Sequence, residues 1–363
     1  MKIVNRYLAR EIYAATALVL VAFIGLFAFF DLIHELGDIG KGDYRLRHAA
    51  LFVLLTVPGH VFELMPIAAL IGAVYALAQL AAHSEVTVMR VSGLSTRRAL
   101  GAVAQIGLLF VAITFVFGEF IAPPAERAAQ ALRLRALTSV IAQEFRSGLW
   151  VKDELRFVNV REVRPDTSLV GVKIYEFDRD YRLRSISFAE RGEYLPPSSW
   201  RLSGVTKTVF GSPEGPRAPP ARIEKSPEFV WTSDLNPDIL GVLLVQPDKM
   251  SISNLYLYTR HLAENRQNTG RYDIALWKKV VYPLAVLVMM ALALPFAYMQ
   301  VRSGGVSLKI FAGIMLGLVF HLLNSLFAHL GAINTWPPFL SAVTPAVLFI
   351  MLAAFMLWRA GRV

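Results

Sequence analysis

Residues 12–33 read IYAATALVLVAFIGLFAFFDLI, a stretch in which Asp31 is the only charged residue. A helix needs roughly 20 apolar residues to cross about 30 Å of hydrocarbon, and this stretch is long enough. Five further segments have the same character, namely about 51–82, about 99–122, 275–300, about 307–330 and 339–358. The sequence therefore predicts six transmembrane helices, the third of them ended by Pro123 and Pro124.

The composition agrees with a membrane protein that carries one large water-facing insert. The chain has 363 residues, of which 55% are hydrophobic and 18% are charged, whereas soluble domains carry about 25% charged residues. The apolar residues gather in 11–122 and 275–358, and a polar block separates them. Cysteine is absent, which excludes disulfides and thiolate metal sites.

The orientation follows from lysine and arginine in the short segments that flank the spans. The segments at one face of the membrane contain Lys2, Arg6, Arg10, Arg90, Arg97, Arg98, Arg302, Lys309, Arg359 and Arg362. At the other face Lys41, Arg45 and Arg47 are offset by Asp38 and Asp43. Both termini and the 83–98 loop are therefore predicted to be cytoplasmic. The block 124–272 would lie outside the cytoplasm, since long domains translocate regardless of their charge.

The polar block has the pattern of a β domain. Residues 150–232 alternate between apolar and polar in short runs that turn-forming residues separate, which predicts an antiparallel sandwich or jelly roll. The alternation slips within YRLRSISF (181–188), which either a β-bulge or a strand that is apolar on both faces would explain. The connectors 124–147 and 250–272 look helical, with Ser251 or Ser253 as the N-cap of the second.

Three regions are therefore expected along the chain. Residues 1–123 would hold transmembrane helices 1–3, and residues 124–272 a periplasmic β-jelly-roll domain with helical connectors. Residues 273–363 would hold transmembrane helices 4–6.

The sequence carries no motif typical of an enzyme. It lacks the phosphate-binding GxxxxGK[ST], the metalloprotease HExxH and the nucleophile elbow GxSxG, and its seven histidines are scattered. We therefore expect no catalytic residue, no metal site and no cofactor bound by this chain. Nucleic-acid binding is also not expected, because the basic insert is predicted to be exported.

Polar side chains inside the fifth span share one helical face. His321, Asn324, Ser325 and His329 follow i, i+3, i+4, i+8 spacing. Polar groups in a membrane are costly, so this face is predicted to be an interface that points to the bundle or to a partner and not to lipid. A proton relay and simple interhelical hydrogen bonding both fit this pattern.

Several motifs in order resemble one family closely. They are S-E-x-x-x-M-R-x-S-G-x-S at 84–95, GEFIAP at 118–123, GLWVKD at 148–153, SISNLYLY at 251–258 and RYDIALWKKVVYPL at 271–284. Together with six spans around an exported β domain, they resemble the lipopolysaccharide export permeases of the LptF/LptG family. The last two motifs look more like the LptG branch than the LptF branch.

The resemblance implies a function and a set of partners. The chain would be the permease subunit of an ATP-driven exporter in the bacterial inner membrane, which passes lipopolysaccharide to a periplasmic bridge. It would pair with the sister permease LptF and with two copies of the cytoplasmic ATPase LptB, which binds the ATP. The single-anchored bridge protein LptC would receive the substrate.

The resemblance also implies roles for particular residues. Glu85, Arg90 and Gly93 in the 83–98 loop would form the segment that couples to the ATPase, and Gly93 would permit a sharp exit before the third span. The first and fifth spans would form lateral gates with the sister permease. Arginine and lysine near the outer surface would contact substrate phosphates, and apolar residues of the first span would line the path of the acyl chains. These substrate-binding residues are Lys41, Arg45, Arg47, Arg133, Arg135, Leu26, Phe27, Phe30 and Ile33.

Two other functions remain open from the sequence. One is an ion-coupled secondary transporter, because two inverted three-span halves suit that class. The other is a membrane-anchored envelope scaffold or sensor, with the exported β domain as the ligand-binding part. Dependence of transport on ATP from another chain would separate both from the exporter.

Overall fold

The computed structural model describes residues 2–93, 95–144, 148–153, 155–163, 168–210, 221–233, 246–298, 305–334 and 336–360. The helices in the first part of the chain are α1 (Lys2–Leu36), α2 (Leu46–Ala82), α3 (Glu85–Val91), α4 (Thr96–Val116), the π-helical η1 (Phe117–Ile121) and α5 (Ala122–Glu144). Those after the strands are the 3₁₀ turn η2 (Pro247–Lys249), α7 (Ile252–Glu264), α8 (Gly270–Tyr298), α9 (Val306–Asn334) and α10 (Pro338–Ala360).

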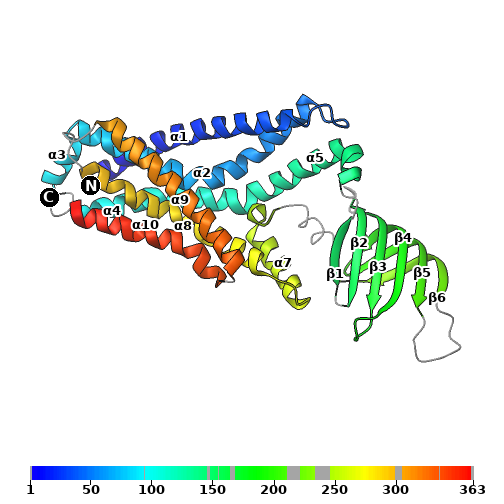
Figure 1. Ribbon diagram of the computed structural model, residues 1–363. Coiled ribbons are helices and arrows are strands. Elements are labelled where there is room, and N and C mark those ends of the chain that lie inside the picture. Colours follow the sequence, from blue (N-terminus) through cyan, green and yellow to red (C-terminus); the bar gives the residue numbers. More distant parts are fainter. Residues whose placement is uncertain are drawn as a thin grey trace.

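The prediction of six spans is confirmed for the described residues. Six helical segments are long and apolar enough to cross a membrane, and they lie at the predicted places. The start of α1, the end of α10 and the short helix α3 lie at one end of the bundle, and the strands lie beyond the other end (Figure 1). We call these the terminal end and the sheet end.

The prediction that the third span ends at Pro123 and Pro124 was wrong. The chain passes through η1, where the backbone N–H of Ala122 donates to the carbonyl of Phe117, and continues as α5. Proline breaks an α-helix because it lacks the N–H and clashes with the carbonyl four residues before it. A π turn changes the positions of those carbonyls, so the two prolines fit within one continuous helix.

The centre of the bundle is formed by α2 and α8. In the most apolar 18-residue stretch of each helix, 78% of the residues of α2 and 72% of those of α8 are buried, whereas only 6% of those of α1 are buried. A helix that is apolar on all sides is typical of such a central position. The outer helices α1, α9 and α10 therefore present most of their apolar surface outward.

The strands form one antiparallel sheet with the order β1-β2-β3-β4-β5-β6. The strands are β1 (Leu149–Asp153), β2 (Arg156–Val163), β3 (Leu169–Phe177), β4 (Leu183–Leu195), β5 (Ser199–Phe210) and β6 (Ala221–Thr232). The register of β3 and β4 shifts between Glu176 and Phe177, which confirms the bulge. The described strands form a meander in a single layer, so the jelly-roll topology stays a prediction.

The sheet shares its hydrophobic core with α7. Trp200 and Leu202 of the sheet and Leu255 of α7 are fully buried members of one cluster. Lys152 Nζ of β1 also donates to the carbonyl of Asn265, just after α7, at 3.2 Å. The predicted helical connectors are thus confirmed as α5 and α7, and the N-cap of α7 is Ser251, whose hydroxyl accepts from the N–H of Asn254.

The contact between α1 and α2 depends on a glycine. A Cβ atom at Gly72 would lie 2.5 Å from Cα of Thr16, which is closer than real Cβ contacts. The absence of a side chain therefore lets the two helix backbones approach closely, as small residues do at membrane interfaces.

We expect Gly72→Ala to push α1 away from α2 and to cost roughly 1–3 kcal/mol of stability, as overpacking does. Thermal unfolding of the purified protein in detergent would measure the loss. Gly59→Ala is the matched control in the same helix, because a Cβ atom there meets nothing within 4 Å. Equal unfolding temperatures for the two variants would contradict this account.

Candidate functional site

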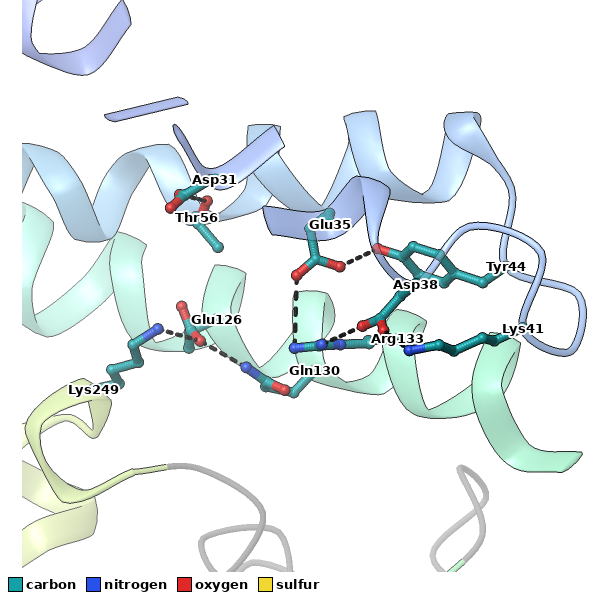
Figure 2. A network of polar contacts seen from close by, with 10 residues as sticks. All are labelled: Asp31, Glu35, Asp38, Lys41, Tyr44, Thr56, Glu126, Gln130, Arg133 and Lys249. Carbon is teal, nitrogen blue, oxygen red and sulfur yellow. Dashed lines mark hydrogen bonds and ion pairs between the residues drawn. The ribbon is translucent and has the colours of Figure 1, made fainter. Parts of the chain in front are cut away.

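A network of charged and polar side chains lies where α1, α2 and α5 meet at the sheet end (Figure 2). The buried Tyr44, in the turn between α1 and α2, donates its hydroxyl to Glu35 Oε2 at 2.6 Å. The backbone N–H of Asp43 donates to the carbonyl of Ala136 in α5 at 3.0 Å, and Tyr44 packs in a cluster with Leu137. The turn is therefore fixed against α5.

Arg133 of α5 is the centre of this network. Its Nη2 lies 2.5 Å from Asp38 Oδ2, and its Nη1 lies 3.6 Å from Glu35 Oε1. Its guanidinium also lies over the ring of Phe52, with 5.7 Å between Cζ and the ring centroid. Lys41 Nζ approaches the other oxygen of Asp38, Oδ1, at 2.6 Å. Two cations and two carboxylates therefore balance each other at this point.

The electrostatics keep Asp38 ionised. The hydrogen bond from Lys41, and next the one from Arg133, hold the pKa of the Asp38 carboxyl below its usual range. Burial, and next the hydrogen bond to Glu35, raise the pKa of the Tyr44 phenol, so this group stays protonated and can donate. The ion pairs are thus complete at neutral pH.

The structure brings together only part of the predicted basic set. Arg133 and Lys41 meet at Asp38, whereas Arg45 pairs with Asp43 at 3.0 Å on the exposed surface. Arg47 is exposed, and the side chain of Arg135 lies outside the described residues. From the sequence, Asp38 was predicted only to offset the charge of the nearby cations. The spacing of Asp38 and Lys41, three residues apart, was the available signal for their pairing.

The apolar residues predicted on α1 lie on its outward surface. Leu26, Phe27, Phe30 and Ile33 are exposed. Beside them, Asp31 Oδ2 lies 2.6 Å from His60 Nε2 of α2. This pair holds α1 to α2 and leaves the apolar face of α1 open to lipid, substrate or a partner chain.

Three of the four polar residues predicted in the fifth span border a recess. His321, Asn324 and Ser325 of α9 line a volume of about 140 Å³, together with side chains of α2 and α8 such as Glu63 and Lys279. Asn324 is buried, whereas His321 is exposed. His329 is exposed and its Nδ1 donates to the carbonyl of Ser325 at 2.8 Å. The shared face thus points partly to the bundle and partly outward.

A larger recess, of about 580 Å³, lies on the sheet between β3 and β6. Seven of its ten lining residues are polar or charged, among them Glu176, Ser185, Lys207 and Glu224. Burial would raise the pKa of Glu176, but hydrogen bonds from Ser185 and Lys207 outweigh it and lower that pKa. A lining with ion pairs does not suit acyl chains.

The start of α7 is anchored to the membrane helices by Glu119 of η1. The carboxylate of Glu119 accepts the backbone N–H of Ile252 at 2.7 Å and that of Ser253 at 3.3 Å, and it also accepts the Ser253 hydroxyl. With Ser251 as the cap for Asn254, the first N–H groups of α7 are satisfied. A negative charge at a helix N-terminus is also electrostatically favourable.

The segment before α7 is held from two further helices. Lys249 Nζ lies 2.9 Å from the buried carboxylate of Glu126 in α5. Lys279 Nζ of α8 donates to the carbonyl of Met250 at 2.5 Å. Since α7 shares a core with the sheet, these contacts connect the sheet to the membrane helices.

The 83–98 loop contains the short helix α3 at the terminal end (Figure 1). No residue of α3 is buried, and Val88 and Val91 are exposed. Arg90 lies over the ring of Tyr298 in α8, with 5.0 Å between Cζ and the centroid. Gly93 has φ +94°, which confirms the sharp exit predicted there. The two exposed valines were not predicted from the sequence, where the charged residues and Gly93 stood out in this loop.

The comparisons with known proteins agree with this architecture. The family model described as lipopolysaccharide export system permease LptF/LptG matches residues 6–359. The chain belongs to this family. The lipopolysaccharide export system permease protein LptG of Escherichia coli K12 is 32% identical over 358 residues, which cover 98% of each chain. The protein of the same name from Haemophilus influenzae is 32% identical over 356 residues, with the same coverage.

The family assignment gives the general function and location. The permease is a subunit of the lipopolysaccharide export system and a multi-pass protein of the inner membrane. The resemblance seen in the sequence motifs, including its LptG character, is thereby confirmed.

We expect Glu119→Ala in the permease to loosen the start of α7, because the N–H groups of Ile252 and Ser253 lose their acceptor. The cost should be about 1–2 kcal/mol. Hydrogen exchange at residues 252–257 would measure faster opening. Glu264→Ala removes an exposed pair with Arg260 at the other end of α7 and should leave this exchange unchanged. Unchanged exchange in Glu119→Ala would contradict the anchoring role.

Proposed function

We propose that this chain is the transmembrane permease subunit of an ATP-driven exporter that extracts lipopolysaccharide from the inner membrane. The substrate then passes to a periplasmic bridge. The observation that carries this proposal is the position of two features at opposite ends of the bundle. An exposed short helix lies at the terminal end, and a cluster of cations lies at the sheet end.

The orientation that fits has the terminal end in the cytoplasm and the sheet in the periplasm. Both termini, α3 and the arginines near it would then be cytoplasmic, in line with the excess of lysine and arginine on that side. The sheet would be the part of the predicted β-jelly-roll domain that contacts substrate or partners outside the membrane.

In this orientation α3 is the coupling helix. Its exposed Val88 and Val91 supply apolar surface, and Glu85 and Arg90 supply both signs of charge. Such a mixture suits a groove on a partner protein. The partner would be the ATPase LptB, as a dimer shared with the sister permease LptF, so this chain itself is not an enzyme.

Arg133 and Lys41 are the proposed contacts for the substrate phosphates. Arginine offers two parallel donors to phosphate oxygens, and lysine offers a point charge. The exposed apolar face of α1, with Leu26 and Phe30, would lie beside the acyl chains. The outward faces of α1 and α9 are the proposed contacts with LptF and LptC, because they bury little surface within this chain.

We expect Glu85→Lys to separate the permease from its ATPase. A charged side chain that is buried in a docked interface can contribute about 2 kcal/mol or more, so binding should fall by more than about tenfold. The measurement is the amount of ATPase that purifies with the tagged chain from native membranes, together with ATP-dependent release of lipopolysaccharide.

Glu264→Lys is the matched control, since it makes the same charge reversal on an exposed residue of α7, on the sheet side of the bundle. It should retain the ATPase. A chain that purifies without any ATPase, or that exports lipopolysaccharide without ATP, would overturn the proposal and favour a secondary transporter or a scaffold.

A further inference from the structure

The cations proposed to bind substrate are already neutralised within the chain. Arg133 contacts Asp38 and Glu35, and Lys41 contacts Asp38. These are not ordinary surface pairs, because the side chain of Arg133 is 31% exposed, that of Asp38 is 18% exposed and that of Glu35 is 3% exposed. A phosphate therefore cannot pair fully with these cations unless a carboxylate gives way.

The two carboxylates differ in how firmly they are held. Glu35 lies in the last turn of α1, is buried, and accepts a hydrogen bond from the hydroxyl of the buried Tyr44. Asp38 lies in the turn between α1 and α2, and among the side chains drawn in Figure 2 its carboxylate contacts only the two cations. Asp38 is thus the carboxylate that can move without breaking the buried pair of Glu35 and Tyr44.

Asp38 lies between the two cations, so a movement of its side chain changes the pairing of both. Its Oδ2 contacts Arg133 and its Oδ1 contacts Lys41, so its departure would free Lys41 and leave Arg133 with only its longer contact to Glu35, at 3.6 Å. We propose that Asp38 is an exchangeable counter-ion for Arg133 and Lys41, which a phosphate group of the lipid substrate displaces on entry and which returns as the substrate leaves. This inference rests on the proposed function, in which these two cations contact the substrate.

The physical advantage lies in release. Arg133 and Lys41 without a counter-ion would attract any phosphate strongly, and a pair of charge-assisted hydrogen bonds holds its ligand well. A carboxylate that replaces the ligand lowers the affinity of the two cations for every phosphate. The ion pairs that it restores offset the free energy lost when the phosphate leaves. The depressed pKa of Asp38 supports this role, because the side chain stays ionised at neutral pH and an anion, not a proton, must open the site.

The test is Asp38→Asn in the assembled complex in nanodiscs of phosphatidylcholine, with lipopolysaccharide as the ligand. Asparagine keeps the shape but loses the charge, so lipopolysaccharide should bind at least about tenfold more tightly, as the loss of one competing ionic hydrogen bond implies. Export per ATPase complex at saturating substrate should fall, because release becomes slow. A lower KM together with a lower kcat is the expected signature.

Three controls make the result specific. Asp43→Asn removes the same charge from an exposed pair with Arg45 in the same turn and should change neither constant. Lipopolysaccharide from which the phosphates have been removed should gain nothing from Asp38→Asn. In a background that lacks both cations, Lys41→Ala with Arg133→Ala, the gain should also disappear.

The failures of the two proposals can be told apart. If Arg133→Ala with Lys41→Ala leaves the binding of lipopolysaccharide unchanged, the proposed substrate contact is wrong. If that variant weakens binding but Asp38→Asn neither tightens binding nor slows export, only the exchange is overturned. Asp38→Asn complexes that unfold at lower temperature and bind more weakly would likewise overturn it and make Asp38 structural. If inorganic phosphate competes with lipopolysaccharide for binding at the same concentration of phosphate groups, the site would be assigned to free phosphate, and the lipid assignment would be overturned.

Discussion

Hydrocarbon offers no hydrogen-bond partner to a peptide group, and the rest of this structure depends on that constraint. Each span must satisfy its own backbone, which only continuous helices achieve in a chain of this kind. The constraint explains why Pro123 and Pro124 do not break the third span, since the π turn η1 rearranges the backbone hydrogen bonds before them. One helical path therefore runs from Thr96 to Glu144 and carries Arg133 toward the sheet end.

The same path organises the junction with the sheet. Glu119 in the π turn accepts the first N–H groups of α7, and Glu126 on the next turns pairs with Lys249. The helix α7 in turn shares a core with Trp200 and Trp231 of the sheet. An irregular turn in the membrane helix is thus in direct contact with the element on which the sheet rests, as π turns often are at functional sites.

The partly buried charges of this permease lie beside groups of opposite charge. The carboxylates and cations around Arg133 neutralise each other, Tyr44 donates to Glu35, and the ring of Phe52 lies against the guanidinium of Arg133. At the terminal end, by contrast, the charges of α3 lie on the surface beside exposed valines. The first arrangement suits an exchange of partners within the protein, and the second suits a contact with another chain.

The sequence by itself determined the six spans, their order around a β region, the bulge in β4 and the turn at Gly93, because each depends on local hydrophobic length, alternation or backbone conformation. It also identified Arg133 and Lys41 as cations near one surface. Only the tertiary structure decided that Asp38 joins them, since Asp38 and Arg133 are 95 residues apart. Likewise, α2 and α8 became central while α1 stayed outside, because all the spans are apolar and only packing selects which of them is buried.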